Sequence, residues 1–140
     1  MMIVPHLTFN GNCKDAMAFY KEVFECEEGS VMSYGDYIPD GMDNPPDDLK
    51  TWVLFADMKV NGSAIWFADE FMENTTGYIV RLTATRPNKA EAQKTFDLLK
   101  VGGRVTMPPV EAFYSTFHAS LVDKFGIYWH IIAEEAPPQA

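Results

Sequence analysis

The feature that most constrains the fold of this chain is that one order of predicted elements occurs twice along its 140 residues. In each half a strand and a helix are followed by three strands, because apolar residues alternate in the predicted strands and recur every three to four residues in the predicted helices. The first half has predicted strands at 3–9, 28–34, 52–60 and 63–68 and a helix at Cys13–Phe24. The second half has predicted strands at 78–85, 104–111, 115–122 and 127–133 and a helix at 89–100.

The last strands of the two halves align when the sequence is shifted by 64 residues. At this offset Trp66 corresponds to His130, and Asp57 corresponds to Leu121. Repetition of a whole element order constrains the architecture more strongly than a single motif does. We therefore predict an α+β fold built from two βαβββ modules, at about 1–70 and 77–133, within one domain that covers 1–140.

Each predicted helix begins after an asparagine that is followed three residues later by an acidic residue. Asn12 precedes Asp15, and Asn88 precedes Glu91, a spacing that resembles a capping box. The two asparagines are about a dozen residues further apart than the last strands are. Residues 35–50, rich in proline and aspartate, account for the difference and are predicted to form a long, mobile loop.

Composition limits the partners and the compartment. The net charge is −9 and the sequence pI is about 4.6, so the chain lacks the basic patch that nucleic acid or an anionic membrane surface would need. No apolar run approaches the length of a membrane span. Two cysteines, Cys13 and Cys26, form no CxxC pair. We expect reduced thiols in a cytoplasmic protein that contacts neither nucleic acid nor membrane.

Two segments carry a family resemblance: residues 11–20 read GNCKDAMAFY, and residues 123–131 read DKFGIYWHI. The first resembles the opening and the second resembles the closing strand of the PhnB-like branch of the vicinal oxygen chelate superfamily, which is also called the glyoxalase/bleomycin-resistance superfamily. The resemblance implies paired βαβββ modules whose mixed sheet curls around a concave pocket. It also implies a homodimer. It does not select an activity, because one fold hosts many functions.

The resemblance also bears on cofactors. PhnB-like sequences often carry a ubiquinone methyltransferase label, but this chain has no GxGxxG turn after a predicted strand that would support it. Members of the superfamily that are enzymes bind a divalent ion through side chains of four strands. Carried onto this chain, these positions are Pro5, Trp66, Ile79 or Val80, and His130. Since only His130 is a ligand type, we predict no metal and no cofactor.

A shift of one residue in the first strand would bring His6 to the ligand position in place of Pro5. The same shift would turn every side chain of that strand to the opposite face. His6 and His130 together would still supply only two ligands.

The predicted ligand pocket contains Trp66, His130, Tyr128 and His118. His130 and Tyr128 alternate with Trp129, and His118 alternates with apolar neighbours in the preceding strand. A pocket histidine could act as a general base near neutral pH. Three of the four also have a structural interpretation: Trp66 as a core tryptophan, His130 as a partly exposed structural histidine and His118 as a surface histidine.

A cluster of aromatic residues lies close to His118 in the sequence. Phe113, Tyr114 and Phe117 could line a ligand cavity or a dimer interface, and a place in the core is the ordinary interpretation of such residues.

Three functions remain open at the level of sequence. The first is a metal-free protein that binds an unidentified small molecule, with an aromatic or a cationic compound as candidates. The second is a metal-dependent lyase, isomerase or dioxygenase with a rearranged site. The third is a dimeric partner protein without catalytic activity. The metal content of the purified protein would distinguish the first function from the second. Whether the concave cavity is open or filled by the protein's own side chains would distinguish the third function from the other two.

Overall fold

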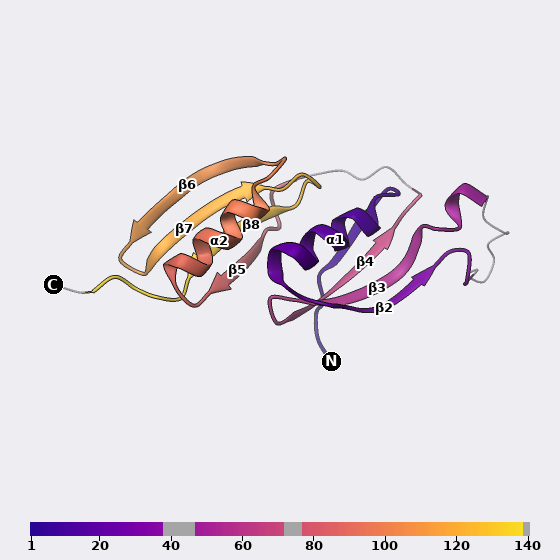
Figure 1. Ribbon diagram of the computed structural model, residues 1–140, viewed down its shortest axis with the longest axis horizontal. Coiled ribbons are helices and arrows are strands. Elements are labelled where there is room, and N and C mark those ends of the chain that lie inside the picture. The colour runs from indigo at the N-terminus through magenta and orange to yellow at the C-terminus, as the bar shows by residue number, and fades with distance from the viewer. Residues whose placement is uncertain (38–46, 72–76, 139–140) are drawn as a thin grey trace. The chain divides into compact units, whose positions relative to one another are not determined.

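The computed structural model describes residues 1–37, 47–71 and 77–138 of the chain (Figure 1). The chain divides into two compact units, Met1–Thr75 and Thr76–Ala140. Each unit has its own sheet and its own long helix. The prediction of a single domain concerns the placement of these units together and stays a prediction.

The first unit is an open four-stranded mixed sheet with one helix. Strand β1 pairs in parallel with β4, and β4, β3 and β2 pair antiparallel, which gives the order β1-β4-β3-β2. Asn61 and Gly62 form the predicted tight turn between β3 and β4, with φ values of 53° and 87°. The elements are β1 (His6–Phe9), α1 (Cys13–Phe24), β2 (Glu28–Ser33), the short 3-10 helix η1 (Asp47–Leu49), β3 (Val53–Val60) and β4 (Ser63–Asp69).

The second unit repeats this topology. Strand β5 pairs in parallel with β8, and the sheet order is β5-β8-β7-β6. The elements are β5 (Leu82–Arg86), α2 (Lys89–Leu99), β6 (Arg104–Ala112), β7 (Ser115–Val122) and β8 (Tyr128–Ala133). The α+β class and the two βαβββ modules are thus confirmed. The prediction of one curled mixed sheet is wrong, because the described strands form two separate four-stranded sheets. A pocket shared by the two units stays a prediction.

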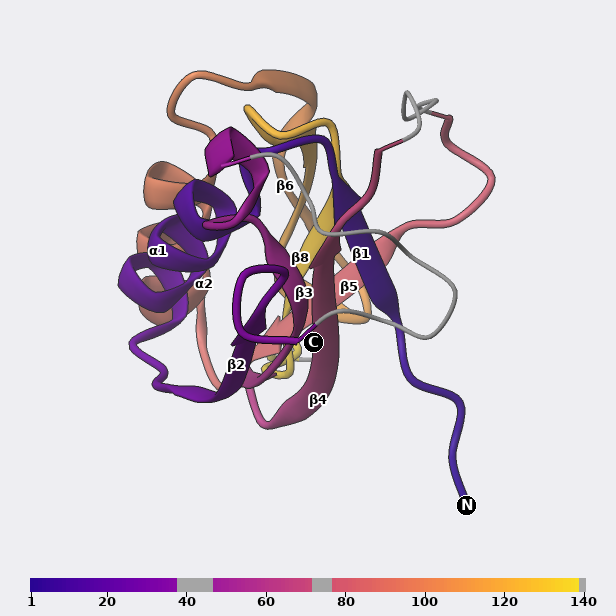
Figure 2. The ribbon, with the colours of Figure 1, turned by 90° about the vertical axis from the view of Figure 1, so that its right-hand side faces the viewer.

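Each helix covers one face of the sheet in its own unit. Helix α1 packs on β3 and β4, as Figure 2 shows, and α2 packs on β5, β7 and β8. The buried side chains recur at helical spacing, as predicted, because one stripe of each helix must leave water. They are Cys13, Ala16, Met17, Phe19, Tyr20, Val23 and Phe24 on α1, and Ala92, Thr95, Phe96 and Leu99 on α2. We call the face of each sheet that its helix leaves uncovered the open face.

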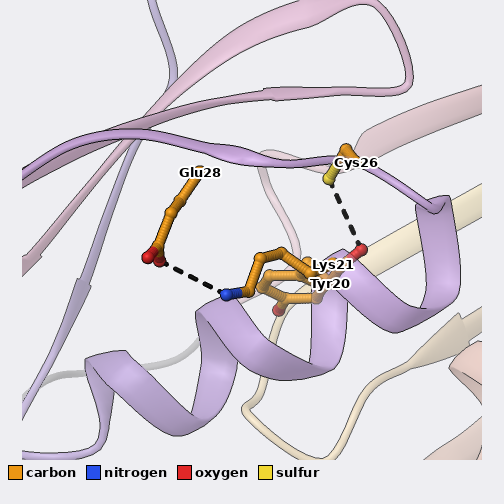
Figure 3. Close-up of polar contacts among 4 residues, drawn as sticks. All are labelled: Tyr20, Lys21, Cys26 and Glu28. Carbon is orange, nitrogen blue, oxygen red and sulfur yellow. Dashed lines mark hydrogen bonds and ion pairs between the residues drawn. The ribbon is translucent and has the colours of Figure 1, made fainter.

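The end of α1 is linked to the start of β2 by two polar contacts (Figure 3). The ammonium of Lys21 lies 3.4 Å from Glu28 Oε2, and the thiol of Cys26 donates to the carbonyl of Tyr20 at 3.7 Å. Glu25 between them adopts the left-handed conformation with φ of 51°, which ends the helix. These contacts fix the direction in which the chain leaves α1.

Some predicted boundaries are wrong. Strand β1 begins at His6 instead of residue 3, and β5 begins at Leu82 instead of residue 78. The apolar side chains of Ile79 and Val80 suggested a strand, but both are exposed outside the sheet. Helix α2 ends at Leu99, one residue early. In the predicted loop 35–50, residues 38–46 lie outside the described residues, so its mobility stays a prediction.

The predicted cap of α1 is also wrong. The side chain of Asn12 makes no capping hydrogen bond. The buried carboxylate of Asp69, at the end of β4, accepts instead from the backbone N–H groups of Gly11 at 2.8 Å and Cys13 at 3.1 Å. In α2 the prediction is confirmed, because Asn88 accepts from the N–H of Glu91 at 2.9 Å.

No helix in residues 1–37, 47–71 and 77–138 is long and apolar enough to cross a membrane.

Candidate functional site

The candidate site lies on the open face of the second sheet, where β7 and β8 run side by side. His118 is paired with Ile132 and Ser120 with His130 across this antiparallel ladder. Successive side chains of a strand point to opposite faces. The alternate residues of both strands are buried on the α2 side: Phe117, Ala119, Leu121, Trp129 and Ile131. His118, His130 and Tyr128 therefore share the open face.

Four side chains on this face form one hydrogen-bonded chain. The hydroxyl of Tyr114 lies 2.6 Å from Nδ1 of His118. Nε2 of His118 lies 2.8 Å from Nδ1 of His130, and Nε2 of His130 lies 3.4 Å from the hydroxyl of Tyr128. Every group in this chain can both donate and accept, so its polarity depends on the tautomers of the two imidazoles. We call these four residues the Tyr–His–His–Tyr chain.

Both imidazoles are held toward the neutral form. Burial lowers the pKa of His118 below its ordinary value, and the positive charge of Arg81 lowers it further. Burial, Arg81 and His118, in that order, lower the pKa of His130. A neutral imidazole can accept a proton as well as donate a hydrogen bond. At neutral pH the chain is thus a network of uncharged groups beside a cation.

Arg81 lies two residues before Thr83, which is paired with His130 across β5 and β8. Strand alternation continued back from Thr83 places Arg81 on the open face as well. Its side chain is exposed, and within the described part of the chain its guanidinium forms no hydrogen bond or ion pair. Its positive charge acts on both imidazoles of this face and lowers their pKa values.

Further polar groups surround the chain. The ring of Tyr78 lies 5.3 Å from the ring of Tyr128, and the hydroxyl of Tyr78 accepts from Arg104 at 2.8 Å. The hydroxyls of Thr106 and Ser120 share a hydrogen bond of 2.6 Å. The open face of the second sheet thus carries many donors, whereas apolar side chains fill the opposite face.

Trp66 lies in the first unit, on the open face of that unit's sheet. It is 38% exposed between the buried Ile65 and Phe67. Its ring lies 5.2 Å from Phe55 and 6.0 Å from His6, in edge-to-face geometry. The structure therefore brings His118, His130 and Tyr128 together within one unit. A cavity shared by Trp66 and His130 stays a prediction.

The register of β1 and β5 corrects two of the carried-over ligand positions. His6, not Pro5, is paired with Trp66, while the carbonyl of Pro5 accepts from the N–H of Trp66. In β5 the residue paired with His130 is Thr83, not Ile79 or Val80.

The repeat alignment also needs a correction in its third strand. Asp57 is paired with Trp66, and Ser120 is paired with His130. Asp57 therefore corresponds to Ser120 and not to Leu121, because the connection between β7 and β8 is longer than the tight turn in the first unit.

The metal-ligating potential of the open faces is small. Among residues 1–37, 47–71 and 77–138 no group of three or more His, Cys, Asp or Glu side chains could hold a metal ion. In the Tyr–His–His–Tyr chain both nitrogens of each imidazole already face a protein partner. An ion at His130 would have to displace Tyr128 from Nε2.

Two residues of the site do not follow from the sequence pattern, Tyr114 and Arg81. The pattern groups Tyr114 with Phe113 and Phe117, but Phe117 is buried against α2 and Tyr114 contacts His118. Arg81 lies two residues before Thr83 in the sequence. This spacing indicates a place in the site only when the register of β5 against β8 is known, because that register pairs Thr83 with His130.

Comparison with known proteins places these features in a family. The chain is 28% identical to the protein YjdN of Escherichia coli K12, over 99% of this chain and all of that protein. The crystal structure of PA1353 from Pseudomonas aeruginosa has a TM-score of 0.82 and 27% identity, and covers 96% of this chain and 98% of its own.

Two further structures share the fold. A Bacillus cereus protein described as a putative 3-demethylubiquinone-9 3-methyltransferase, PhnB protein, has a TM-score of 0.75 at 24% identity, over 95% of this chain and 99% of its own. A glyoxylase/bleomycin resistance protein/dioxygenase domain from Frankia has a TM-score of 0.66 at 15% identity, over 96% and 92% of the two chains.

The family model described as 3-demethylubiquinone-9 3-methyltransferase matches residues 1–132, which is most of the chain. This chain therefore belongs to that family, the PhnB-like family, and has the fold of the glyoxalase/bleomycin-resistance proteins of the vicinal oxygen chelate superfamily.

Proposed function

We propose that this protein binds a small molecule on the open face of its second sheet, and that it does so without a catalytic metal. The Tyr–His–His–Tyr chain supplies the polar contacts of the site, and Arg81 supplies a charge. Small-molecule sites contain a few convergent polar groups, and the four side chains of this network converge on one face of β7 and β8.

The hydrogen bond between His118 and His130 is the observation that carries the proposal. Two imidazoles that share a 2.8 Å hydrogen bond are partly buried, uncharged and aligned. Buried polar networks are costly to assemble unless all of their members are satisfied. The core of the unit lies on the other face, so this network is not needed to fill the core, which supports a role in binding.

The same bond argues against an ion bound at these histidines. Metal ligands of the imidazole type keep one nitrogen for the ion and use the other for an orienting partner. Here the nitrogens face one another and two tyrosines. The methyltransferase activity in the family description receives no support from a glycine-rich nucleotide turn in this sequence.

Two further proposals concern the whole protein. We retain the homodimer, which the family resemblance implies, and we retain Trp66, on the open face of the first sheet, as a ring on which an aromatic ligand stacks. We also retain the cytoplasm, with which the free thiols of Cys13 and Cys26 are compatible.

A ligand-library thermal-shift screen, run with and without divalent ions, tests the proposal. Binding stabilises the folded protein in proportion to the logarithm of ligand concentration over Kd, and so raises the melting temperature. We expect stabilising compounds whose effect is the same in EDTA and in added zinc or nickel. Stabilisation only in the presence of an ion, together with near one ion per chain by elemental analysis, would instead support the metal-dependent enzyme.

A further inference from the structure

The number of protons in the Tyr–His–His–Tyr chain limits what it can offer a ligand. When uncharged, the two hydroxyls and two imidazoles hold four protons, and three of these lie in the hydrogen bonds between neighbours. The fourth points outward at one end only. If the chain points from Tyr114 toward Tyr128, the outward donor is the hydroxyl of Tyr128.

Adding one proton changes this pattern without breaking it. All three internal hydrogen bonds survive, both terminal hydroxyls then donate outward, and one positive charge is shared by His118 and His130. The protonated chain can accept outward only through the remaining lone pairs of its hydroxyl oxygens. It is therefore matched to a ligand that accepts hydrogen bonds and carries negative charge.

The cations on the open face favour the same ligand. Arg81 acts on both histidines and has no ion-pair partner within the described residues. A second guanidinium, that of Arg104 on β6, lies beyond Tyr128 and donates to the hydroxyl of Tyr78. Both positive charges therefore border the Tyr128 end of the chain.

The carboxylates near this face are already engaged or turned away. Glu135 lies beside Thr116, two residues before His118, and its Oε2 accepts from the hydroxyl of Thr116 at 3.0 Å and from the N–H of Lys89 at 3.1 Å. Strand alternation turns Glu111 of β6 away, because Val110 is the residue paired with His118. The balance of charge beside the two histidines is therefore positive.

The weakest link of the chain shows where such a ligand would enter. The contact between His130 Nε2 and the hydroxyl of Tyr128 is 3.4 Å, longer than the other two. An N–H···O hydrogen bond prefers about 2.9 Å. A carboxylate placed between these groups can accept from both, with Arg81 on the same face.

We propose that the site takes a small organic carboxylate and that binding is coupled to the uptake of one proton by the His118–His130 pair. This inference rests on the proposed function and adds to it the chemical class of the ligand. The negative charge of the carboxylate offsets the positive charge gained by the pair, and Arg81 contributes a second favourable charge. The net charge of −9 makes this local cationic group the place where an anion can bind.

The direction of the pH dependence follows from the groups that face the pair. These are Arg81 before β5, Tyr128 on β8, Tyr114 before β7, and no ionisable side chain at Val110 of β6. In the free protein the histidine pKa values lie below the ordinary value. A bound carboxylate raises them. Affinity should therefore increase as pH falls through the pKa of the complex and level off below the pKa of the free pair.

Benzoate is a suitable probe, with benzamide as its uncharged isostere. Isothermal titration calorimetry in buffers of different ionisation enthalpy measures both the affinity and the protons taken up. We expect benzoate to bind with uptake approaching one proton, and its affinity to rise about tenfold for each unit by which pH falls where uptake is complete. Benzamide should bind more weakly and without uptake.

Two variants distinguish the contribution of the Arg81 charge to benzoate affinity from the contribution of proton uptake. Arg81→Gln should weaken benzoate binding about tenfold at every pH, in the range of a lost charge-assisted contact, and keep the pH slope. His130→Gln should abolish the slope. Lys14→Gln, which removes one exposed positive charge from α1 of the other unit, should change neither quantity.

Proton NMR provides a readout that does not depend on variants. The protein has three histidines. His6 lies in the first unit and is not part of the Tyr–His–His–Tyr chain. Benzoate should raise the titration midpoint of one or both of the other two. Equal binding of benzoate and benzamide, or binding without proton uptake, would overturn the inference.

The library screen separates this failure from failure of the proposed function. Neutral or cationic compounds that stabilise the protein while benzoate and other carboxylates do not would refute the carboxylate class alone. An absence of any stabilising compound would refute small-molecule binding, and with it this inference.

Discussion

At the residue scale, His130 is the centre of the open face because it hydrogen-bonds on both sides, to His118 and to Tyr128. Its ring is only partly buried and contributes nothing to the core beneath α2. We therefore expect His130 to contribute more to the placement of hydrogen-bond donors at the surface than to the stability of the sheet.

Replacing His130 with alanine should leave the fold nearly intact. We expect a loss of about 1 kcal/mol in the free energy of unfolding, the net value of ordinary hydrogen bonds at a partly exposed site. Urea denaturation measures this loss, and the thermal-shift response to stabilising ligands should disappear in the same variant. A loss of several kcal/mol, or an unchanged ligand response, would contradict the role assigned to the residue.

Asp69 should behave in the opposite way. Its side chain is 1% exposed, and its carboxylate accepts from the backbone N–H groups of Gly11, Cys13 and Val53. Asp69→Ala leaves three donors without this acceptor and should cost at least about 3 kcal/mol in urea denaturation. Asp15→Asn, which alters an exposed carboxylate on α1, should cost less than about 0.5 kcal/mol. Similar losses in the two variants would be inconsistent with this assignment.

The sequence pattern alone predicts part of the site. Strand alternation puts His130 and Tyr128 on one face of their strand and His118 on one face of the next, and the structure brings all three together. Alternation does not predict that Tyr114 reaches back across a turn to His118, because that contact depends on the turn geometry. Alternation also does not predict whether Pro5 or His6 is paired with Trp66, since register is a property of the pairing of two strands and not of one strand.

At the scale of elements, the two helices begin by different means. Helix α2 carries its own cap in Asn88, whereas α1 depends on a carboxylate from the far end of β4. The two sequences look alike at this point, so the same substitution in each helix should have different effects.

Asn88→Ala should therefore destabilise the protein by about 1 kcal/mol, the usual value of a side-chain cap. The matched change Asn12→Ala should cost less than about 0.5 kcal/mol, because no capping hydrogen bond is lost. Chemical denaturation of both variants under the same conditions measures the contrast. Equal costs would mean that Asn12 caps α1 after all.

The elements are predictable where the periodicity is strong. The bounds of α1 follow correctly from the sequence because its buried stripe extends to both ends of the helix. The start of β5 does not, because Ile79 and Val80 are apolar yet exposed, and hydrophobicity alone does not distinguish a strand from an exposed connection.

At the scale of the whole molecule, the second unit presents apolar side chains at the edge of its sheet. Strand β6 is an edge strand, and Val105, Val110 and the adjoining Phe113 are exposed. Exposed apolar side chains that gather at one edge of a sheet can be buried between two chains. This observation agrees with the homodimer that the family resemblance implies.

We expect light scattering to give about twice the chain mass of 15.8 kDa, and we expect two-fold symmetry, the commonest arrangement of homodimers. Val110→Lys, on the exposed edge, should shift the mass toward the monomer if β6 lies in the interface. Lys59→Gln on β3 is the control and should leave the mass unchanged. A monomeric mass at tens of micromolar for the unaltered chain would contradict the prediction.

The dependence of α1 on Asp69 has a consequence for the order in which the nascent chain can acquire structure. Helix α2 has its capping residue within its own sequence, because Asn88 accepts from the N–H of Glu91. The first turn of α1 must wait until 56 more residues have been synthesised and β4 has joined the sheet. Closing so long a loop is slow compared with helix formation. Locking of α1 is therefore coupled to assembly of the first sheet, whereas the cap of α2 is local to its own helix.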